Sequence, residues 1–70
     1  MRRFMVYFIE EGELDANEFA LVTEYDTNTN LRLYRFVNLD SDSILPEVFS
    51  APTFALDWLD KNFESWVCIS

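Results

Sequence analysis

The chain has 70 residues, enough for a single small globular domain (residues 1–70), and at this length only about 60% of the unfolded surface becomes buried on folding. Thirteen carboxylates against five cationic side chains give a net charge of −8, which argues against direct binding of DNA, RNA or anionic membranes. No apolar run approaches the roughly 20 residues that span a bilayer.

The first predicted element is a strand from Arg3 to Ile9, because a short run of β-branched and aromatic residues bounded by charges favours a strand over a helix. Both of its faces are apolar. They consist of Phe4, Val6 and Phe8 on one side and Met5, Tyr7 and Ile9 on the other. Residues 10–18 (EEGELDANE) hold five carboxylates, the only glycine and no base, and we expect them to form a polar connection to the next strand.

The second predicted strand runs from Glu18 to Asp26, with Phe19 and Leu21 on one side. Residues 26–30 (DTNTN) are turn formers and predict an antiparallel hairpin with a third strand from Leu31 to Leu39. For this third strand we expect one set of alternate residues to face the core and the other to face outward. The expected core set is Leu31, Leu33, Arg35, Val37 and Leu39, and the expected outward set is Arg32, Tyr34, Phe36 and Asn38.

Residues 40–51 predict a connection whose apolar members, Ile44, Leu45, Val48 and Phe49, tuck against the sheet with room for one helical turn. The clearest helix begins near Pro52 or Thr53, where proline suits the first turn, and runs to about Glu64. A last short strand spans residues 65–69. The expected fold class is therefore α+β: a β-β-β-α-β domain with a mainly antiparallel sheet and one helix packed on one face.

Apolar and acidic residues separate onto different sides of the predicted helix. The packing side is expected to consist of Ala55, Trp58, Leu59, Asn62, Phe63 and Trp66, and the acidic side of Asp57, Asp60, Lys61 and Glu64. Six aromatic residues are expected to belong mainly to the core: Phe4, Phe8, Phe19, Phe54, Trp58 and Phe63.

Catalysis is not expected, because the chain has no histidine to act as a general base, to activate a nucleophile or to bind a transition metal. The lone Cys68 cannot build a structural zinc site, and the single Gly12 excludes glycine-rich phosphate loops. A calcium loop that starts at Glu13 fails because its sixth position, which requires glycine, is Glu18. We expect no catalytic residue, no metal site and no cofactor.

The acidic side chains allow two interpretations. Carboxylates spaced along a rigid domain can imitate a nucleic-acid backbone and steer the domain into a basic groove of a protein partner. Alternatively, the charge serves only to keep an aromatic-rich chain soluble. The candidate acidic contacts are Glu10, Glu11, Glu13, Asp15, Asp57, Asp60 and Glu64.

Half of the residues are hydrophobic and twelve are aromatic, which is more apolar side chain than one small core readily hides. The candidate aromatic contacts are Tyr7, Tyr34, Phe36 and Trp66. With Met5 and Arg32, they would give an exposed sheet face the composition of a protein-binding hot spot or of a homodimer interface.

These features favour a non-enzymatic acidic protein-binding module, most concretely an inhibitor that occludes a basic nucleic-acid-binding protein by charge mimicry. Small acidic proteins of this kind are frequently encoded by viruses and mobile elements, an analogy of size and charge alone. The alternative is a homo-oligomeric structural or accessory protein, and a third interpretation is a cation-binding protein. A single cysteine and the lack of a secretory signal favour the cytoplasm, or the host cytoplasm for a viral protein.

Overall fold

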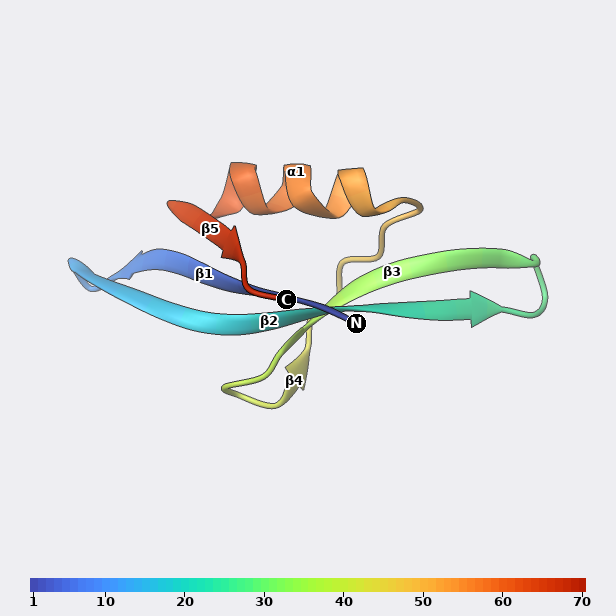
Figure 1. Cartoon of the computed structure of the whole chain (residues 1–70), viewed down its shortest axis with the longest axis horizontal. Coiled ribbons are helices and arrows are strands. Elements are labelled where there is room, and N and C mark those ends of the chain that lie inside the picture. Colours follow the sequence, from blue (N-terminus) through green and yellow to red (C-terminus); the bar gives the residue numbers. More distant parts are fainter.

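The computed structural model describes residues 1–70 and shows one five-stranded antiparallel sheet with one helix, which confirms the predicted α+β class. The strands lie in the order β4-β3-β2-β1-β5, with α1 on one face of the sheet (Figure 1). Their bounds are β1 Arg2–Glu10, β2 Glu13–Asp26, β3 Leu31–Asn38, β4 Ser43–Ile44, α1 Pro52–Asn62 and β5 Ser65–Cys68.

The acidic run 10–18 is not the polar connection that the sequence predicts. Strand β2 already begins at Glu13 and pairs with β1 up to Glu10, so that only Glu11 and Gly12 form the turn. Residues 14–18 pair with the apolar residues 5–9 of β1, and these supply the partner strand. This pairing overrides the low strand propensity of Asp, Asn and Glu.

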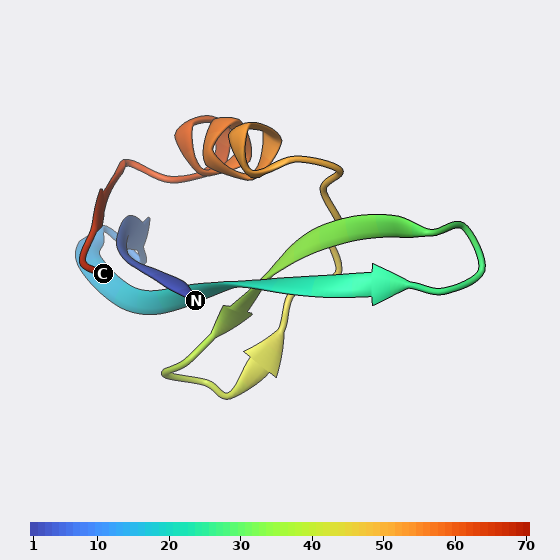
Figure 2. The same ribbon diagram turned by 45° about the vertical axis from the view of Figure 1, so that its right-hand side comes forward.

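Strands β2 and β3 form the predicted hairpin, in which Asp26 pairs with Leu31 across a four-residue turn. The Asp26 carboxylate accepts the backbone N–H of Asn28 at 2.9 Å, and Asn30 has a φ of 59°, which asparagine tolerates better than most residues. Strand β2 extends beyond the start of β1, so this hairpin projects as a two-stranded ribbon (Figure 2).

The predicted core face of β3 is wrong. The register pairs Leu21 with Phe36 and Thr23 with Tyr34, which turns these two aromatic residues toward the helix. Phe36 is fully buried, whereas Leu31 is exposed. Because opposed residues in an antiparallel pair share a face, the length of the β2–β3 turn decides which β3 set is buried.

Residues 39–51 contain no helical turn. They form the short strand β4 and a bridge between Tyr34 and Phe49, whose backbone N–H and C=O groups exchange two hydrogen bonds of 2.8 Å. As predicted, Leu45 and Phe49 pack against the core, but Ile44 and Val48 remain exposed.

Helix α1 begins with Pro52 in its first turn and ends at Asn62, two residues before the predicted end. It ends there because Phe63 adopts an extended backbone and directs its ring against Phe8 and Phe19. The core consists of Phe4, Val6, Phe19, Leu21, Phe36, Ala55 and Leu59. Phe54, expected in the core, is 58% exposed on the helix.

The molecule is elongated, with extents of 44 × 22 × 22 Å, and its two hairpins point toward opposite ends of the long axis (Figure 1). The single helix, of 11 residues, is neither long nor apolar enough to cross a bilayer.

Candidate functional site

Four carboxylates are concentrated at the tip of the β1–β2 hairpin, and we call this group the acidic tip: Glu10, Glu11, Glu13 and Asp15. Glu10 and Glu13 are direct cross-strand partners. Between them, Glu11 and Gly12 have φ values of 52° and 82°, as the tight type I′ hairpin turn requires. Glycine adopts this conformation freely, whereas glutamate does not.

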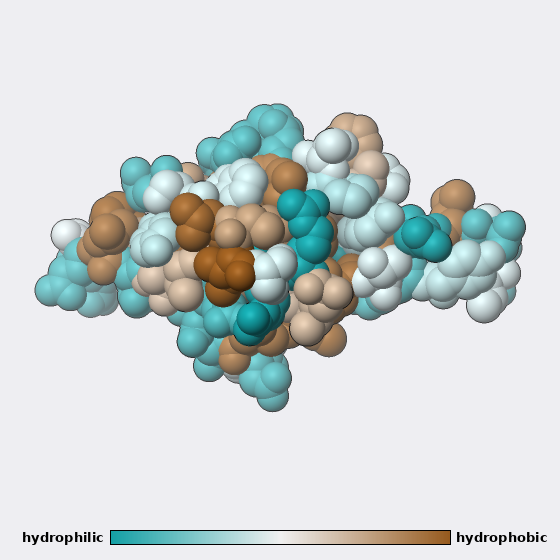
Figure 3. Space-filling model, viewed as in Figure 1, coloured by the Kyte–Doolittle hydropathy of each residue, from teal (hydrophilic) through white to brown (hydrophobic).

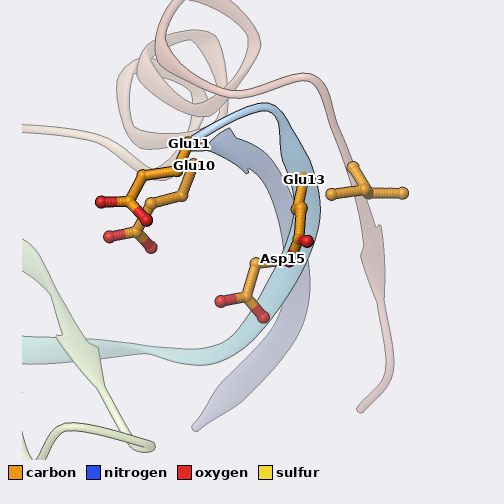
Figure 4. Close-up of a pocket in the computed structure, with 5 residues that line it drawn as sticks. Glu10, Glu11, Glu13 and Asp15 are labelled. Carbon is orange, nitrogen blue, oxygen red and sulfur yellow. The ribbon is translucent and has the colours of Figure 1, made fainter.

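The acidic tip surrounds the only pocket of the molecule, a hollow of about 300 Å³ lined by its four carboxylates and Leu14. Glu10, Glu11 and Asp15 extend to the same side of the hairpin (Figure 4). None of the four forms an ion pair with a cationic side chain, because the three ion pairs of the chain involve Glu18, Glu24 and Asp57.

Of the three acidic residues predicted on the helix, Asp57 and Asp60 have side-chain partners within the fold, and Glu64 lies beyond the end of α1. Asp57 is paired with Lys61 at 2.9 Å, one helical turn away. Asp60 accepts the indole N–H of Trp66 at 2.7 Å, which fastens β5 to α1. Glu64 forms no side-chain bond, although its backbone N–H donates to the carbonyl of Tyr7 at 3.0 Å. Of the helix acids, only Glu64 therefore remains unpaired.

The charge of the molecule is distributed unevenly. The acidic tip and α1 with Glu64 contain seven of the thirteen carboxylates but only Lys61 of the five cationic side chains, a net −6 of the total −8. Hydrophilic side chains gather at the hairpin tip and on part of the outer side of the helix, with exposed apolar side chains beside them (Figure 3). The remaining six carboxylates are offset by four arginines, so the rest of the chain carries only −2.

The four predicted aromatic contacts do not lie on one surface. Phe36 is fully buried and cannot contact a partner in the folded state. Tyr34 and Trp66 are partly buried against the core on the helix side, and the Trp66 ring lies edge-on to Phe4 at 5.6 Å. Only Tyr7 lies on the opposite face of the sheet. For Tyr34 and Phe36 the expected outward orientation is wrong because they lie on the β3 face that meets the helix.

The sheet face opposite α1, which we call the open face, is covered by no other element. The register places apolar residues of all five strands on it: Met5, Tyr7, Ile9, Leu14, Val22, Leu31, Leu33, Val37, Ile44 and Val67. Among them Leu14 and Ile44 are 65% and 64% exposed. The sequence signal for this surface is that both faces of β1 are apolar while only one helix is available to cover them.

The open face also contains four charged side chains that neutralise one another. Arg3 is paired with Glu18 at 3.0 Å, and Arg35 with Glu24 at 3.5 Å. Asp26, at the far end of this face, is held by the β2–β3 turn. The middle of the open face is therefore electrically neutral, in contrast to the rest of the surface.

No group of three or more His, Cys, Asp or Glu side chains is arranged to hold a metal ion, and Cys68 is exposed without a group that could activate it. Comparisons of the chain with protein-family models, with curated proteins and with solved structures gave no match.

Proposed function

We propose that this protein is a non-enzymatic binding module whose acidic tip docks onto a basic protein. In its most concrete form it inhibits a nucleic-acid-binding protein by occupying the groove that otherwise holds the phosphate backbone. The observation that carries the proposal is the concentration of four carboxylates, without a cationic partner, on a hairpin that projects from the end of the molecule.

The arrangement of charges at the acidic tip lowers the stability of the fold. Glu10 and Glu13 are directly opposed like charges, which destabilises a strand pair. Glu11 occupies a left-handed position that asparagine or glycine would fill with less strain. A basic partner would offset this repulsion, and a projecting negative end would be steered toward it over long distances. Solubility alone would be served as well by carboxylates at unstrained positions.

The test is affinity capture of basic proteins with the immobilised chain, at about 50 mM and about 500 mM salt, because screening weakens contacts between exposed charges. We expect captured proteins that bind nucleic acid and that are released by DNA or by high salt. The double substitution Glu10→Gln and Glu13→Gln should weaken capture about tenfold or more.

The matched control is Asp42→Asn with Glu47→Gln. It removes the same number of charges from unpaired carboxylates outside the tip. Equal capture by the tip variant and the control variant would contradict the proposal, as would capture that is insensitive to DNA.

A further inference from the structure

We infer that the open face is the interface of a homodimer, in which a second copy of the chain packs its own open face against the first. This inference does not depend on the acidic tip. It identifies a second copy of the chain as the partner for the sheet face that no other element of the fold covers.

The first observation is the degree of exposure. Only eight of the 70 residues are buried, while eleven large hydrophobic residues are exposed. Five of these eleven lie on the open face: Ile9, Leu14, Leu31, Ile44 and Val67. Each of the five strands contributes one of them, and between them on the same face lie partly exposed apolar side chains such as Val22 and Leu33. Exposed apolar side chains that gather on one uncovered sheet face are typical of an interaction site.

The second observation is the available area. The five strands contain 37 residues, and at about 3.3 Å along a strand and about 4.8 Å between strands they outline a sheet of about 600 Å², near the lower end of interface sizes, for which about 800 Å² per partner is standard. A face-to-face contact of two sheets places the same residues on both sides, as a two-fold homodimer requires.

The third observation is the charge. Two chains of net charge −8 repel each other, and a neutral contact surface adds no close contacts between like charges to this repulsion. The middle of the open face is neutral because its two arginines are paired with two glutamates. The acidic tip lies at one end of the 44 Å axis. An antiparallel arrangement therefore keeps the two tips at opposite ends of the dimer, much farther apart than the Debye length of about 10 Å.

The experiment is sedimentation equilibrium of the full chain over about 1 to 300 μM, with circular dichroism to confirm that each variant is folded. We expect a monomer–dimer equilibrium that strengthens as salt is raised, because salt screens the repulsion between two acidic chains. Salt should thus strengthen dimerisation but weaken the binding of a basic partner at the acidic tip. The failure of one proposal is therefore distinguishable from the failure of the other.

The interface variant is Val67→Glu, on the open face and 49% exposed in the monomer. Burying its uncompensated charge should weaken the dimer about tenfold or more. The matched control is Phe54→Glu, which is 58% exposed on the helix and introduces the same charge, and it should leave the dimer unchanged. Ile44→Glu, on β4, repeats the test on a separate strand in case Val67→Glu disturbs the edge strand β5.

The antiparallel arrangement is tested by spin labels at Glu13→Cys in a Cys68→Ser background. We expect label distances of about 40 Å or more, since the tips lie at opposite ends. If the chain is a monomer at every concentration, the inference is overturned and the open face would be left to a different protein. Equal weakening by Val67→Glu and Phe54→Glu would also overturn it, as would labels closer than about 25 Å.

Discussion

At the scale of single residues, carboxylates with the same formal charge have different roles. Asp60 is bonded to the Trp66 indole and joins α1 to the edge strand β5, whereas Asp57 forms an exposed ion pair within one helix. Asp60 therefore holds two elements together, whereas Asp57 does not. Exposed ion pairs contribute little because solvent screens them, while a hydrogen bond to a charged acceptor contributes more.

We expect Asp60→Ala to lower the free energy of unfolding by about 1 kcal/mol or more. Asp57→Ala should change it by less than about 0.5 kcal/mol. Urea unfolding followed by tryptophan fluorescence measures both. If the two variants have the same stability, the Asp60–Trp66 bond does not fasten β5 to α1.

The turn at the acidic tip provides a second prediction. Glu11→Asn should raise the free energy of unfolding by about 0.5 kcal/mol, because asparagine accepts a positive φ and one like charge is removed. Gly12→Ala should lower it by about 1 kcal/mol, since its φ of 82° strains any residue with a Cβ. Thermal unfolding of both variants measures these changes. If the turn had the opposite hand, Glu11→Asn would not stabilise the fold and Gly12→Ala would not destabilise it.

The third prediction concerns acid. The backbone N–H of Asn28, together with the side chain and N–H of Thr29, holds the pKa of Asp26 below its ordinary value of 3.8. A carboxyl whose pKa is lower in the folded state stabilises the fold at pH values above the unfolded pKa. This contribution is lost as the pH falls through the lowered pKa.

Asp26→Asn retains the acceptor oxygen but cannot titrate. Its stability should therefore fall less steeply than that of the parent chain between about pH 4 and pH 2, as measured by urea unfolding at each pH. Parallel curves for the two proteins would show that Asp26 does not contribute to acid unfolding.

At the scale of elements, the fold depends on which face of β3 meets the helix. Phe36 is surrounded by the rings of Phe4, Phe19, Phe49 and Trp58, with centroid distances of 5.7–6.1 Å. Leu33, on the other set of β3 residues, lies on the open face and is only partly buried. The two positions should therefore respond differently to truncation.

We expect Phe36→Ala to cost about 3–5 kcal/mol, which is close to the whole stability of a domain of this size and should leave the chain largely unfolded. Leu33→Ala should cost only about 1 kcal/mol and remain folded. Circular dichroism and the dispersion of amide resonances measure the outcome. The reverse result would mean that β3 is paired one residue out of the register described.

Local patterns in the sequence predict most of the elements. The run 3–9, the DTNTN turn and Pro52 locate β1, the β2–β3 hairpin and the start of α1 to within one or two residues. The early start of β2 at Glu13 could not be predicted, because the first residues of β2 have a low strand propensity and are held in the strand by their pairing with β1. The face of β3 could not be predicted either, since it depends on the hairpin register and both faces contain large apolar residues.

The candidate site is predictable only in part. The acidic run at the tip is visible in the sequence, but the hairpin that projects it results from strand pairing. The internal partners of Asp57 and Asp60 depend on helical spacing and on the tertiary contact with Trp66. The sequence predicts Phe36 on the surface because it does not determine which face of β3 meets the helix. The open face is defined only by the helix, which covers the other side of the sheet (Figure 1).

At the scale of the whole molecule, two surfaces of opposite character coexist. The acidic tip at one end of the long axis is charged and lacks cationic partners, while the open face along the sheet is apolar and neutral in its middle. Salt should weaken contacts made by the first and strengthen association through the second. An antiparallel dimer would carry one free acidic tip at each end and could bind two basic partners.

The most direct test of the central claim is the affinity of the chain for a captured basic protein, measured by isothermal titration calorimetry at several salt concentrations. We predict that Glu10→Gln with Glu13→Gln weakens binding about tenfold or more and flattens the salt dependence. Asp42→Asn with Glu47→Gln should stay within about twofold of the parent chain. Unchanged affinity and salt dependence in the tip variant would contradict the claim that the acidic tip is the binding surface.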